Sequence, residues 1–322
     1  MTMIFLKQIE KIYRKQVLTR FKDYGTIYYF SEKDFPGLNK KAFDFKGSDG
    51  QKLQGYFYFY DSPIQNRLII FDHGMGGGHR SYFREIETLA KKGYLVFSYD
   101  HTGCMESEGE NTRGFSQSLN DLDCCIKALK GLNELNGFDF SVMGHSWGGF
   151  SSMNIPSLHT DISHVVAMSG FVSVSEMLKQ IFYGVKGFYS YFYAIEEKNN
   201  PIFSKVNTVE SLKDTSTKVL IIHSADDKTV NGKKHFEVIK KGLSANENIE
   251  FLLLDGKNHN PNFTKDAVKY KDEFFKILSK KLKKHELSTD QQKKAFVESF
   301  DWWKMTAQDE KVWKRIFDFL ES

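Results

Sequence analysis

A serine lies between two glycines at the junction of an apolar segment and a segment with helical character. The run reads Gly144-His145-Ser146-Trp147-Gly148, and residues 138–143 before it are typical of a short buried strand. Glycines on both sides leave room for a strained turn that lifts the serine hydroxyl above the sheet edge. Amides at the start of the following helix can then bind a developing oxyanion. The segment predicts a nucleophile elbow with Ser146 as nucleophile; the alternative is a glycine-rich turn whose serine has no function.

A serine hydroxyl attacks only when a base takes its proton and a carboxylate orients that base. Sites on parallel sheets lie beyond the carboxyl ends of the strands. Asp227 is the predicted acid, because it lies in the loop after the apolar run 219–223. Its neighbour Asp226 is the alternative acid. Whichever of the two aspartates is not the acid would only cap a turn.

His259 is the predicted base, because it comes directly after the last apolar run, 249–254. The resulting chain order, Ser then Asp then His, is typical of a nucleophile elbow on a parallel sheet. His223, His235 and His285 are the alternatives.

A tetrahedral intermediate needs a second amide donor besides that of Trp147. The run 73–78 contains four glycines and follows an apolar strand, so its backbone can approach a substrate carbonyl. Met75 is the predicted donor. The run lacks the Lys-Ser/Thr ending of a phosphate-binding loop and the spacing of a dinucleotide fingerprint, so no cofactor is predicted.

Alternating strands and helices must position these groups. A hairpin through Ser48-Asp49-Gly50 comes first, and the apolar runs that follow are separated by helical segments. The predicted strands after the hairpin are 67–71, 94–99, 138–143, 164–168, 218–223 and 249–254. Such alternation predicts an α/β fold with a mainly parallel sheet covered by helices on both faces.

One long segment without a predicted strand, 171–212, interrupts this alternation and is rich in aromatic residues. We interpret it as a helical lid, with Tyr183, Phe188 and Phe192 lining a substrate pocket. The alternative is that these rings only pack the insertion onto the body. The domain boundaries that follow are a core in two parts, 1–170 and 213–322, around the lid; residues 263–322 are expected to be helical.

Composition excludes several other classes of function. The 322 residues carry 45 basic and 41 acidic side chains, so the net charge of +4 predicts no nucleic-acid partner, and the basic stretch 276–284 is typical of a solvated helix face. Cys104, Cys124 and Cys125 suit neither a disulfide framework nor a metal site, which favours the cytoplasm. Residues 1–20 alternate apolar with charged side chains, so we expect an amphipathic helix packed on the body and no stable membrane insertion. No feature of the sequence predicts an oligomeric state.

Several of these motifs, in this order, resemble the α/β-hydrolase superfamily. They are His73-Gly74-Met75-Gly76, Tyr82, Gly93-Tyr94-Leu95-Val96, the run 100–110 and Gly144-His145-Ser146-Trp147-Gly148-Gly149. The chain is most similar to the branch of monoacylglycerol lipases, lysophospholipases and serine aminopeptidases. The resemblance covers about 43–156 specifically, and 219–230 and 255–259 more weakly. It implies the same roles for Ser146, Asp227, His259 and the Met75 and Trp147 amides.

The chain departs from the superfamily at three positions. Thr102 and Met105 replace the usual Arg and Gly of the turn after the aspartate at position 100, and Ser224 replaces a Gly before the acid. These changes affect the expected substrate more than the expected machinery.

The predicted function is that of a serine hydrolase that cleaves a small-molecule carboxylic ester through an acyl-enzyme intermediate. The aromatic insertion favours an apolar acyl or aryl group. A thioesterase would use the same groups, and a peptidase would be favoured if Glu196 or Glu197 were placed to hold a substrate amine. A noncatalytic ligand-binding protein on the same fold is the alternative of another class; such proteins usually lack a triad member, whereas all three are present here.

Overall fold

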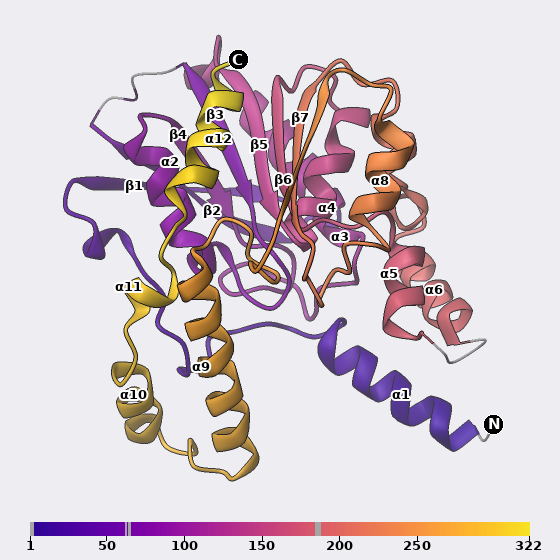
Figure 1. Ribbon diagram of the computed structural model, residues 1–322, viewed down its shortest axis with the longest axis vertical. Helices are drawn as coiled ribbons and strands as arrows, with labels where there is room; N and C mark the ends of the chain where they lie inside the picture. The colour runs from indigo at the N-terminus through magenta and orange to yellow at the C-terminus, as the bar shows by residue number, and fades with distance from the viewer. Residues whose placement is uncertain (1–2, 62, 64–65, 184–187) are drawn as a thin grey trace.

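The computed structural model describes residues 3–61, 63, 66–183 and 188–322 (Figure 1). Its centre is an eight-stranded sheet with the order β1-β2-β4-β3-β5-β6-β7-β8. The hairpin β1 (Leu38–Lys46) and β2 (Lys52–Tyr60) is antiparallel, and β2 also pairs antiparallel with β4. All later neighbours in this order pair in parallel.

The parallel strands coincide closely with the predicted apolar runs. They are β3 (Arg67–Asp72), β4 (Leu95–Tyr99), β5 (Asp139–His145), β6 (His164–Met168), β7 (Lys218–Ser224) and β8 (Ile249–Leu254). Side chains of β3 alternate between two core clusters, Leu68 and Ile70 in one and Ile69 and Phe71 in the other. Burial on both faces explains why these strands read as continuous apolar runs. The predicted α/β fold with a mainly parallel sheet is confirmed.

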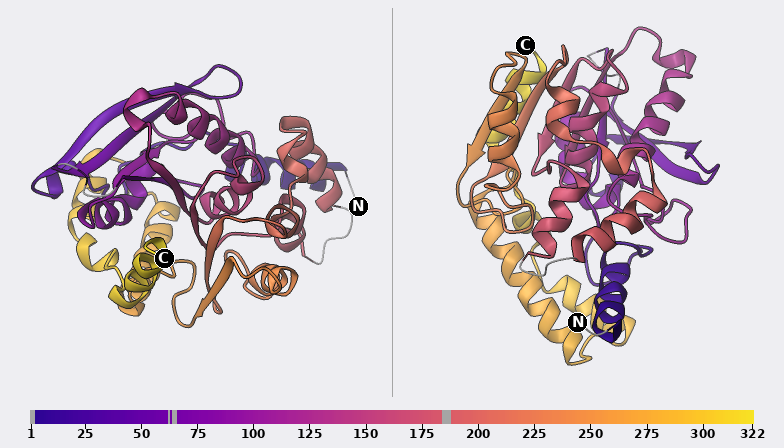
Figure 2. Two further views of the ribbon diagram at one scale, coloured as in Figure 1. Left: turned by 90° about the horizontal axis from the view of Figure 1, so that it is seen from above. Right: turned by 90° about the vertical axis from the view of Figure 1, so that its right-hand side faces the viewer.

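Helices cover both faces of the sheet, as Figure 2 shows. On one face lie α3 (Gln117–Lys130), α4 (Trp147–Asn154) and α8 (Phe236–Leu243). On the other lie α2 (Phe83–Lys91), α9 (Lys265–Lys283) and α12 (Glu310–Leu320). The carboxyl ends of β3, β5, β7 and β8 therefore open at one edge between two helical layers, where the predicted functional side chains come together.

The long segment between β6 and β7 is helical where the structure describes it. It contains α5 (Val174–Ile181), α6 (Phe188–Asn199) and the short α7 (Thr208–Leu212). The N-terminal helix α1 (Met3–Gln16) lies beside α6, and its Tyr13 side chain is buried there. The predicted N-terminal helix is thus present from residue 3, while residues 1 and 2 lie outside the described part. The domain boundaries at 170 and 212 stay predictions.

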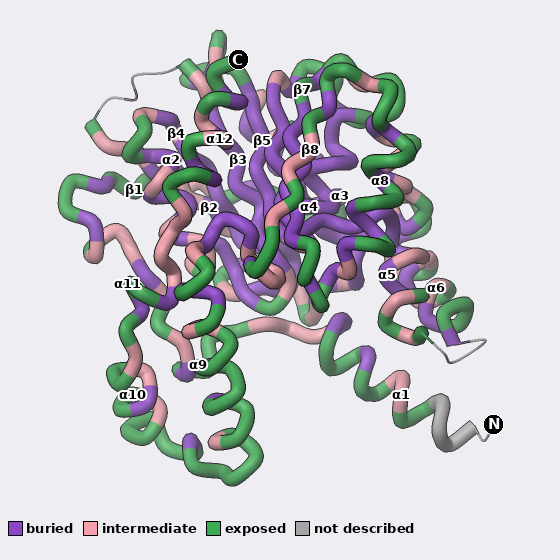
Figure 3. The backbone as a smooth tube through the Cα atoms, viewed as in Figure 1, coloured by how far each residue is buried: buried purple, intermediate pink, exposed green. Residues whose placement is uncertain are grey.

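The C-terminal residues form extra helices, as expected. After α9 come α10 (Asp290–Glu298) and the short α11 (Trp302–Met305), and Phe274 of α9 packs against rings of both. Much of α9 is exposed where it extends beyond the sheet (Figure 3). Its basic stretch 276–284 lies largely on that exposed surface. Over residues 3–61, 63, 66–183 and 188–322, every helix is too short or too polar to span a bilayer.

Candidate active site

Ser146 lies in a sharp turn between β5 and α4. Its backbone has φ 58° and ψ −109°, a strained left-handed conformation for a residue with a side chain. The Ser146 amide donates to the Met168 carbonyl at 2.8 Å, which ties the turn to β6. Such an outlier at a strand-to-helix junction is the geometry that the sequence predicted for a nucleophile elbow.

The flanking glycines are required by close backbone contacts. A Cβ added at Gly144 would lie 2.2 Å from the Gly148 carbonyl oxygen, and one at Gly148 would lie 2.1 Å from the Asp72 carbonyl oxygen. Only glycine allows this approach, because backbone cannot move aside as a flexible side chain can. The elbow is thereby pressed against the carboxyl end of β3.

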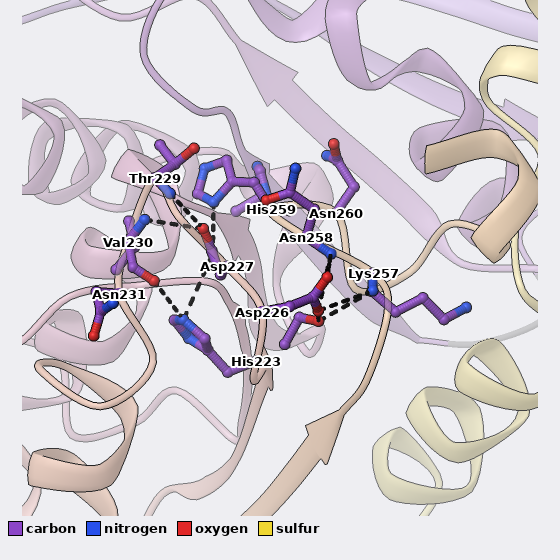
Figure 4. A network of polar contacts seen from close by, with 12 residues as sticks. His223, Asp226, Asp227, Thr229, Val230, Asn231, Lys257, Asn258, His259 and Asn260 are labelled. Atoms are coloured by element: carbon purple, nitrogen blue, oxygen red, sulfur yellow. Dashed lines mark hydrogen bonds and ion pairs between the residues drawn. The ribbon is translucent and has the colours of Figure 1, made fainter. Parts of the chain in front are cut away.

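Asp227 and His259 lie in hydrogen-bond contact with each other (Figure 4), and the His259 carbonyl contacts His145, the residue before Ser146. The Nδ1 of His259 is 2.7 Å from Oδ2 of Asp227, which is buried. The other carboxylate oxygen of Asp227 accepts the amides of Thr229 at 2.8 Å and Val230 at 3.0 Å. Two amides fix the carboxylate, which in turn orients the imidazole with Nδ1–H toward the acid and Nε2 free to take a proton.

Asp226 has a different set of partners. Its Oδ1 accepts the amides of Gly256 at 2.9 Å and Lys257 at 3.2 Å, and also the Ser224 hydroxyl at 2.5 Å. These bonds hold the turn that leads to His259. Asp226 therefore has the turn-capping arrangement, and Asp227 has the arrangement of a triad acid.

The alternative histidines are placed differently. His223 donates from Nε2 to the Val230 carbonyl at 2.9 Å, and burial lowers its pKa. His235 is buried and accepts the Val172 amide at 3.3 Å, and His285 lies in an exposed turn after α9. His223 does lie 3.6 Å from Oδ2 of Asp227, but its Nε2 hydrogen is committed to a carbonyl.

The glycine run after β3, residues 74–77, forms a loop next to the serine. We call these four residues, which include the predicted oxyanion donor Met75, the oxyanion loop. A Cβ added at Gly74 would lie 3.4 Å from Cβ of Ser146, so loop and elbow are in contact. His73 Nδ1 donates to the Gly74 carbonyl at 2.8 Å, and burial lowers the pKa of His73 to about 3, so the ring is neutral. In a trans peptide the Met75 N–H points opposite to that carbonyl.

Trp147, the other predicted donor, is the first residue of α4. An amide at this position has no partner within its own helix. The indole N–H donates to the Phe115 carbonyl, and the side chain is buried. The residue is thus held by its ring while its amide stays at the helix start beside Ser146.

A chain of contacts that the sequence does not predict joins the elbow, the base and Tyr82. His145 Nε2 donates to the His259 carbonyl at 2.6 Å, and the Tyr82 hydroxyl donates to His145 Nδ1 at 2.8 Å. Burial holds the pKa of His145 well below its usual range, consistent with a neutral ring. In the sequence, Tyr82 belongs only to the motifs that resemble the superfamily, and His145 is the variable position of the elbow. Their presence in those motifs was the only available signal.

The three rings predicted to line a pocket in the insertion have unlike surroundings. Tyr183 is 80% exposed, whereas Phe188 and Phe192 are buried. The ring of Phe192 lies 4.3 Å from that of Phe182 and 4.7 Å from that of Tyr13. The rings thus pack α5, α6 and α1 together, and their role in a pocket stays a prediction.

The two glutamates considered for a substrate amine are engaged elsewhere. Glu196 is buried and accepts the Tyr13 hydroxyl and the Phe115 amide. Glu197 pairs with Lys205 at 3.0 Å. The structure therefore offers no argument for a peptidase from either carboxylate.

The segment that matches a known family contains Ser146 and the glycine run but ends before Asp227 and His259. Residues 67–201 match a protein-family model described as alpha/beta hydrolase fold. Human Protein ABHD12B is 24% identical over 225 residues, which cover 63% of this chain and 59% of that protein. The match thus spans less than two thirds of that relative's length. An uncharacterized protein of Acanthamoeba polyphaga mimivirus is 24% identical over 218 residues, covering 63% of this chain and 70% of that protein.

Solved structures share the fold. An esterase of Pyrococcus furiosus has a TM-score of 0.60 at 19% identity and covers 83% of this chain and 98% of its own. Est1E of Butyrivibrio proteoclasticus, solved with ferulic acid bound, has a TM-score of 0.54 at 19% identity and covers 75% of this chain and 99% of its own.

Proposed function

The chain belongs to the α/β-hydrolase superfamily, and we propose that it is a serine hydrolase that cleaves a carboxylic ester with an apolar acyl or aryl group. The observation that carries this proposal is the buried Asp227 bonded to His259, beside a strained serine that faces a glycine loop. Esterases among the structures of the same fold support the reaction class.

In this proposal, Ser146 Oγ attacks the ester carbonyl while His259 Nε2 takes its proton. The Asp227 carboxylate stabilises the imidazolium that forms, and the Met75 and Trp147 amides bind the oxyanion. His259 then protonates the leaving alcohol, and water attacks the acyl-enzyme with His259 again as base. This sequence needs no group beyond those side chains, the two amides and water.

The peptidase alternative has no observation in its favour, because Glu196 and Glu197 are already paired. A thioester would pass through the same steps, and a matched thioester substrate would measure that preference. The noncatalytic alternative is excluded if the protein turns over any ester.

Labelling with a fluorophosphonate, followed by hydrolysis of p-nitrophenyl acetate, tests the proposal. The wild type should be labelled, and Ser146→Ala should lose the label and on the order of 10⁶ in kcat. Ser48→Ala, at an exposed turn of the hairpin, is the matched control and should keep both the fluorophosphonate label and the wild-type kcat. A folded Ser146→Ala protein that retains more than a tenth of wild-type turnover would overturn the assignment.

A further inference from the structure

A cavity begins at the oxyanion loop and extends away from the insertion. Its volume is about 260 Å³, and its walls come from the oxyanion loop, from residues 27–30 and from helices α9 and α11. The sequence predicts substrate contacts from the segment 171–212 instead. Here the C-terminal helices and a segment near the N-terminus build the space next to the predicted oxyanion donor.

The walls of this cavity are largely aromatic. Rings at the wall include Phe30, Tyr82, Phe274, Phe275 and Trp302. An apolar cavity of roughly 150 Å³ is known to bind benzene. The space is therefore sufficient for one aromatic ring with a few further atoms, and it is small for a long alkyl chain.

Three cations also line the cavity without a close ion pair, although the Glu85 carboxyl acts on Lys271 and Arg84 at longer range. In the described part of the chain, Arg80, Arg84 and Lys271 form no ion pair with a carboxylate within 4.0 Å. Lys271 Nζ donates to the neutral Asn260 Oδ1 at 3.0 Å, and Arg84 lies over the Trp303 ring at 4.4 Å. Burial lowers the pKa of both Lys271 and Arg84.

Partly desolvated cations are costly without a counter-charge. A ligand that brought a carboxylate into this aromatic space would satisfy them. Arg80 is the most available of these three cations, because its contacts in the described part of the chain are a hydrogen bond to the Tyr29 carbonyl at 3.4 Å and a cation–π contact with the Tyr29 ring.

The position of the cavity indicates which part of an ester would enter it. The leaving alcohol must lie next to His259, which protonates it. The described residues that line the cavity include Met75, the predicted donor to the acyl carbonyl oxygen, and do not include Ser146, Asp227 or His259. The cavity thus adjoins the predicted oxyanion donor and not the predicted base, which favours the acyl group over the leaving alcohol as its occupant.

We propose that this cavity binds the acyl group of the substrate, and that this group is an aromatic acid residue bearing a second, negatively charged carboxylate. The proposal rests on the serine esterase function proposed above. Arg80 and Lys271 contact the carboxylate, and Phe275 and its neighbours hold the ring.

Hydrolysis of three p-nitrophenyl esters by the full chain tests this assignment. The acyl groups are acetyl, 3-phenylpropionyl and 3-(4-carboxyphenyl)propionyl, so that the last two differ only in the carboxylate. The wild type should have a higher kcat/KM for the carboxylated ester than for its neutral match. Arg80→Gln and Lys271→Met should each lower the ratio of carboxylated to neutral ester about tenfold, because a charged hydrogen bond is lost. Phe275→Ala should lower kcat/KM for both aryl esters relative to kcat/KM for the acetate ester.

Matched controls lie on the same helix outside the cavity. Lys276→Met and Ile277→Ala change an exposed lysine and a 41% exposed apolar residue of α9, and should leave the ratios as in the wild type. A wild type that prefers the neutral ester, or cavity variants whose ratios equal those of the controls, would overturn the inference even when Ser146 is labelled and acetate is hydrolysed. Absence of labelling and of all hydrolysis would overturn the proposed function itself, and the inference with it.

Discussion

At the residue scale, the two adjacent aspartates after β7 have different hydrogen-bond partners. Asp227 contacts the His259 imidazole, and Asp226 accepts amides of the turn before it. We expect Asp227→Asn to lose about 10⁴ in kcat, because the histidine is left in the wrong tautomer. Asp226→Asn should lose far less, since an amide oxygen can still accept the turn amides. Ester hydrolysis by the two variants measures this, and the reverse order would show that Asp226 is the acid.

Gly148 tests whether the elbow must stay pressed against β3. Its added Cβ would meet the Asp72 carbonyl oxygen at 2.1 Å, so Gly148→Ala must displace backbone. A misplacement of about 1 Å can cost about 10² in rate, and we expect a loss of kcat of at least that order. Gly232→Ala is the control, because a Cβ there meets nothing closer than 3.4 Å. Equal activity of both variants would show that the elbow tolerates a shift.

The sequence could predict residues whose role depends on their own strand end. Asp227 and His259 each follow an apolar run, and the structure brings them into contact. The contacts of His145 with Tyr82 and with His259 span 63 and 114 residues. A local sequence pattern cannot indicate contacts between residues so far apart in the chain, so these partners become visible only in the folded structure.

At the element scale, helix α6 is held by its buried rings. Phe192 is fully buried against Phe182 and Tyr13, whereas Tyr183 is 80% exposed. Phe192→Ala should therefore lower the free energy of unfolding by about 3–5 kcal/mol, and Tyr183→Ala should change it little. Urea denaturation of both variants at one pH measures the difference. A small effect at Phe192 would show that the insertion contributes little packing energy.

A triple alanine variant tests the hypothesis, drawn from the sequence, that the insertion lines an acyl pocket. If Tyr183, Phe188 and Phe192 line an acyl pocket, kcat/KM should rise several-fold per two carbons from acetyl toward medium-chain p-nitrophenyl esters, since each buried methylene is worth about 0.8 kcal/mol. Replacing all three rings by alanine should flatten that rise. A profile that is flat in the wild type, or unchanged in the triple variant, would leave the rings with packing alone.

The type of each helix and strand was predictable, because the periodicity of apolar residues is a local property of the sequence. The packing of these elements against one another was not predictable in this way. The apolar runs gave β3 and β5–β8 within a residue or two, and residues 263–322 are helical as expected. That α1 packs on α6, and that α11 packs on α9, depends on contacts between segments far apart in the chain. Amphipathic periodicity identifies an apolar face without its partner.

At the scale of the whole molecule, helices from both ends of the chain surround the strand ends that carry the site. Figure 1 shows α1 with α5 and α6 on one side below the sheet, and α9 with α10 on the other. The cavity beside the oxyanion loop joins residues 27–30 to α9 and α11, which are more than 200 residues further along the chain. A sequence pattern could not place substrate contacts there.

Glu196 links several of these parts and makes stability depend on pH. Its carboxyl accepts the Tyr13 hydroxyl of α1 and the Phe115 amide, and the Phe115 carbonyl in turn accepts the Trp147 indole. Burial raises the pKa of Glu196 to about 7. An unfolded glutamate titrates near 4.5. Between these values the folded chain keeps a proton that the unfolded chain has lost, so this contribution is complete below about pH 4.5 and is lost as the pH rises through about 7.

A pKa difference of this size corresponds to about 3 kcal/mol. Glu196→Gln carries no titrating proton and loses one acceptor oxygen at every pH. Its free energy of unfolding should therefore rise relative to that of the wild type by up to about 3 kcal/mol between pH 5 and pH 8, measured by urea denaturation at each pH. Glu197→Gln is the control, because that carboxylate is partly exposed and paired with Lys205. Parallel pH profiles of the free energy of unfolding for the wild type and Glu196→Gln would contradict this prediction. They would mean that Glu196 ionises in the folded protein as it does in the unfolded chain, and that the contact between α1 and α6 does not depend on protonation of Glu196.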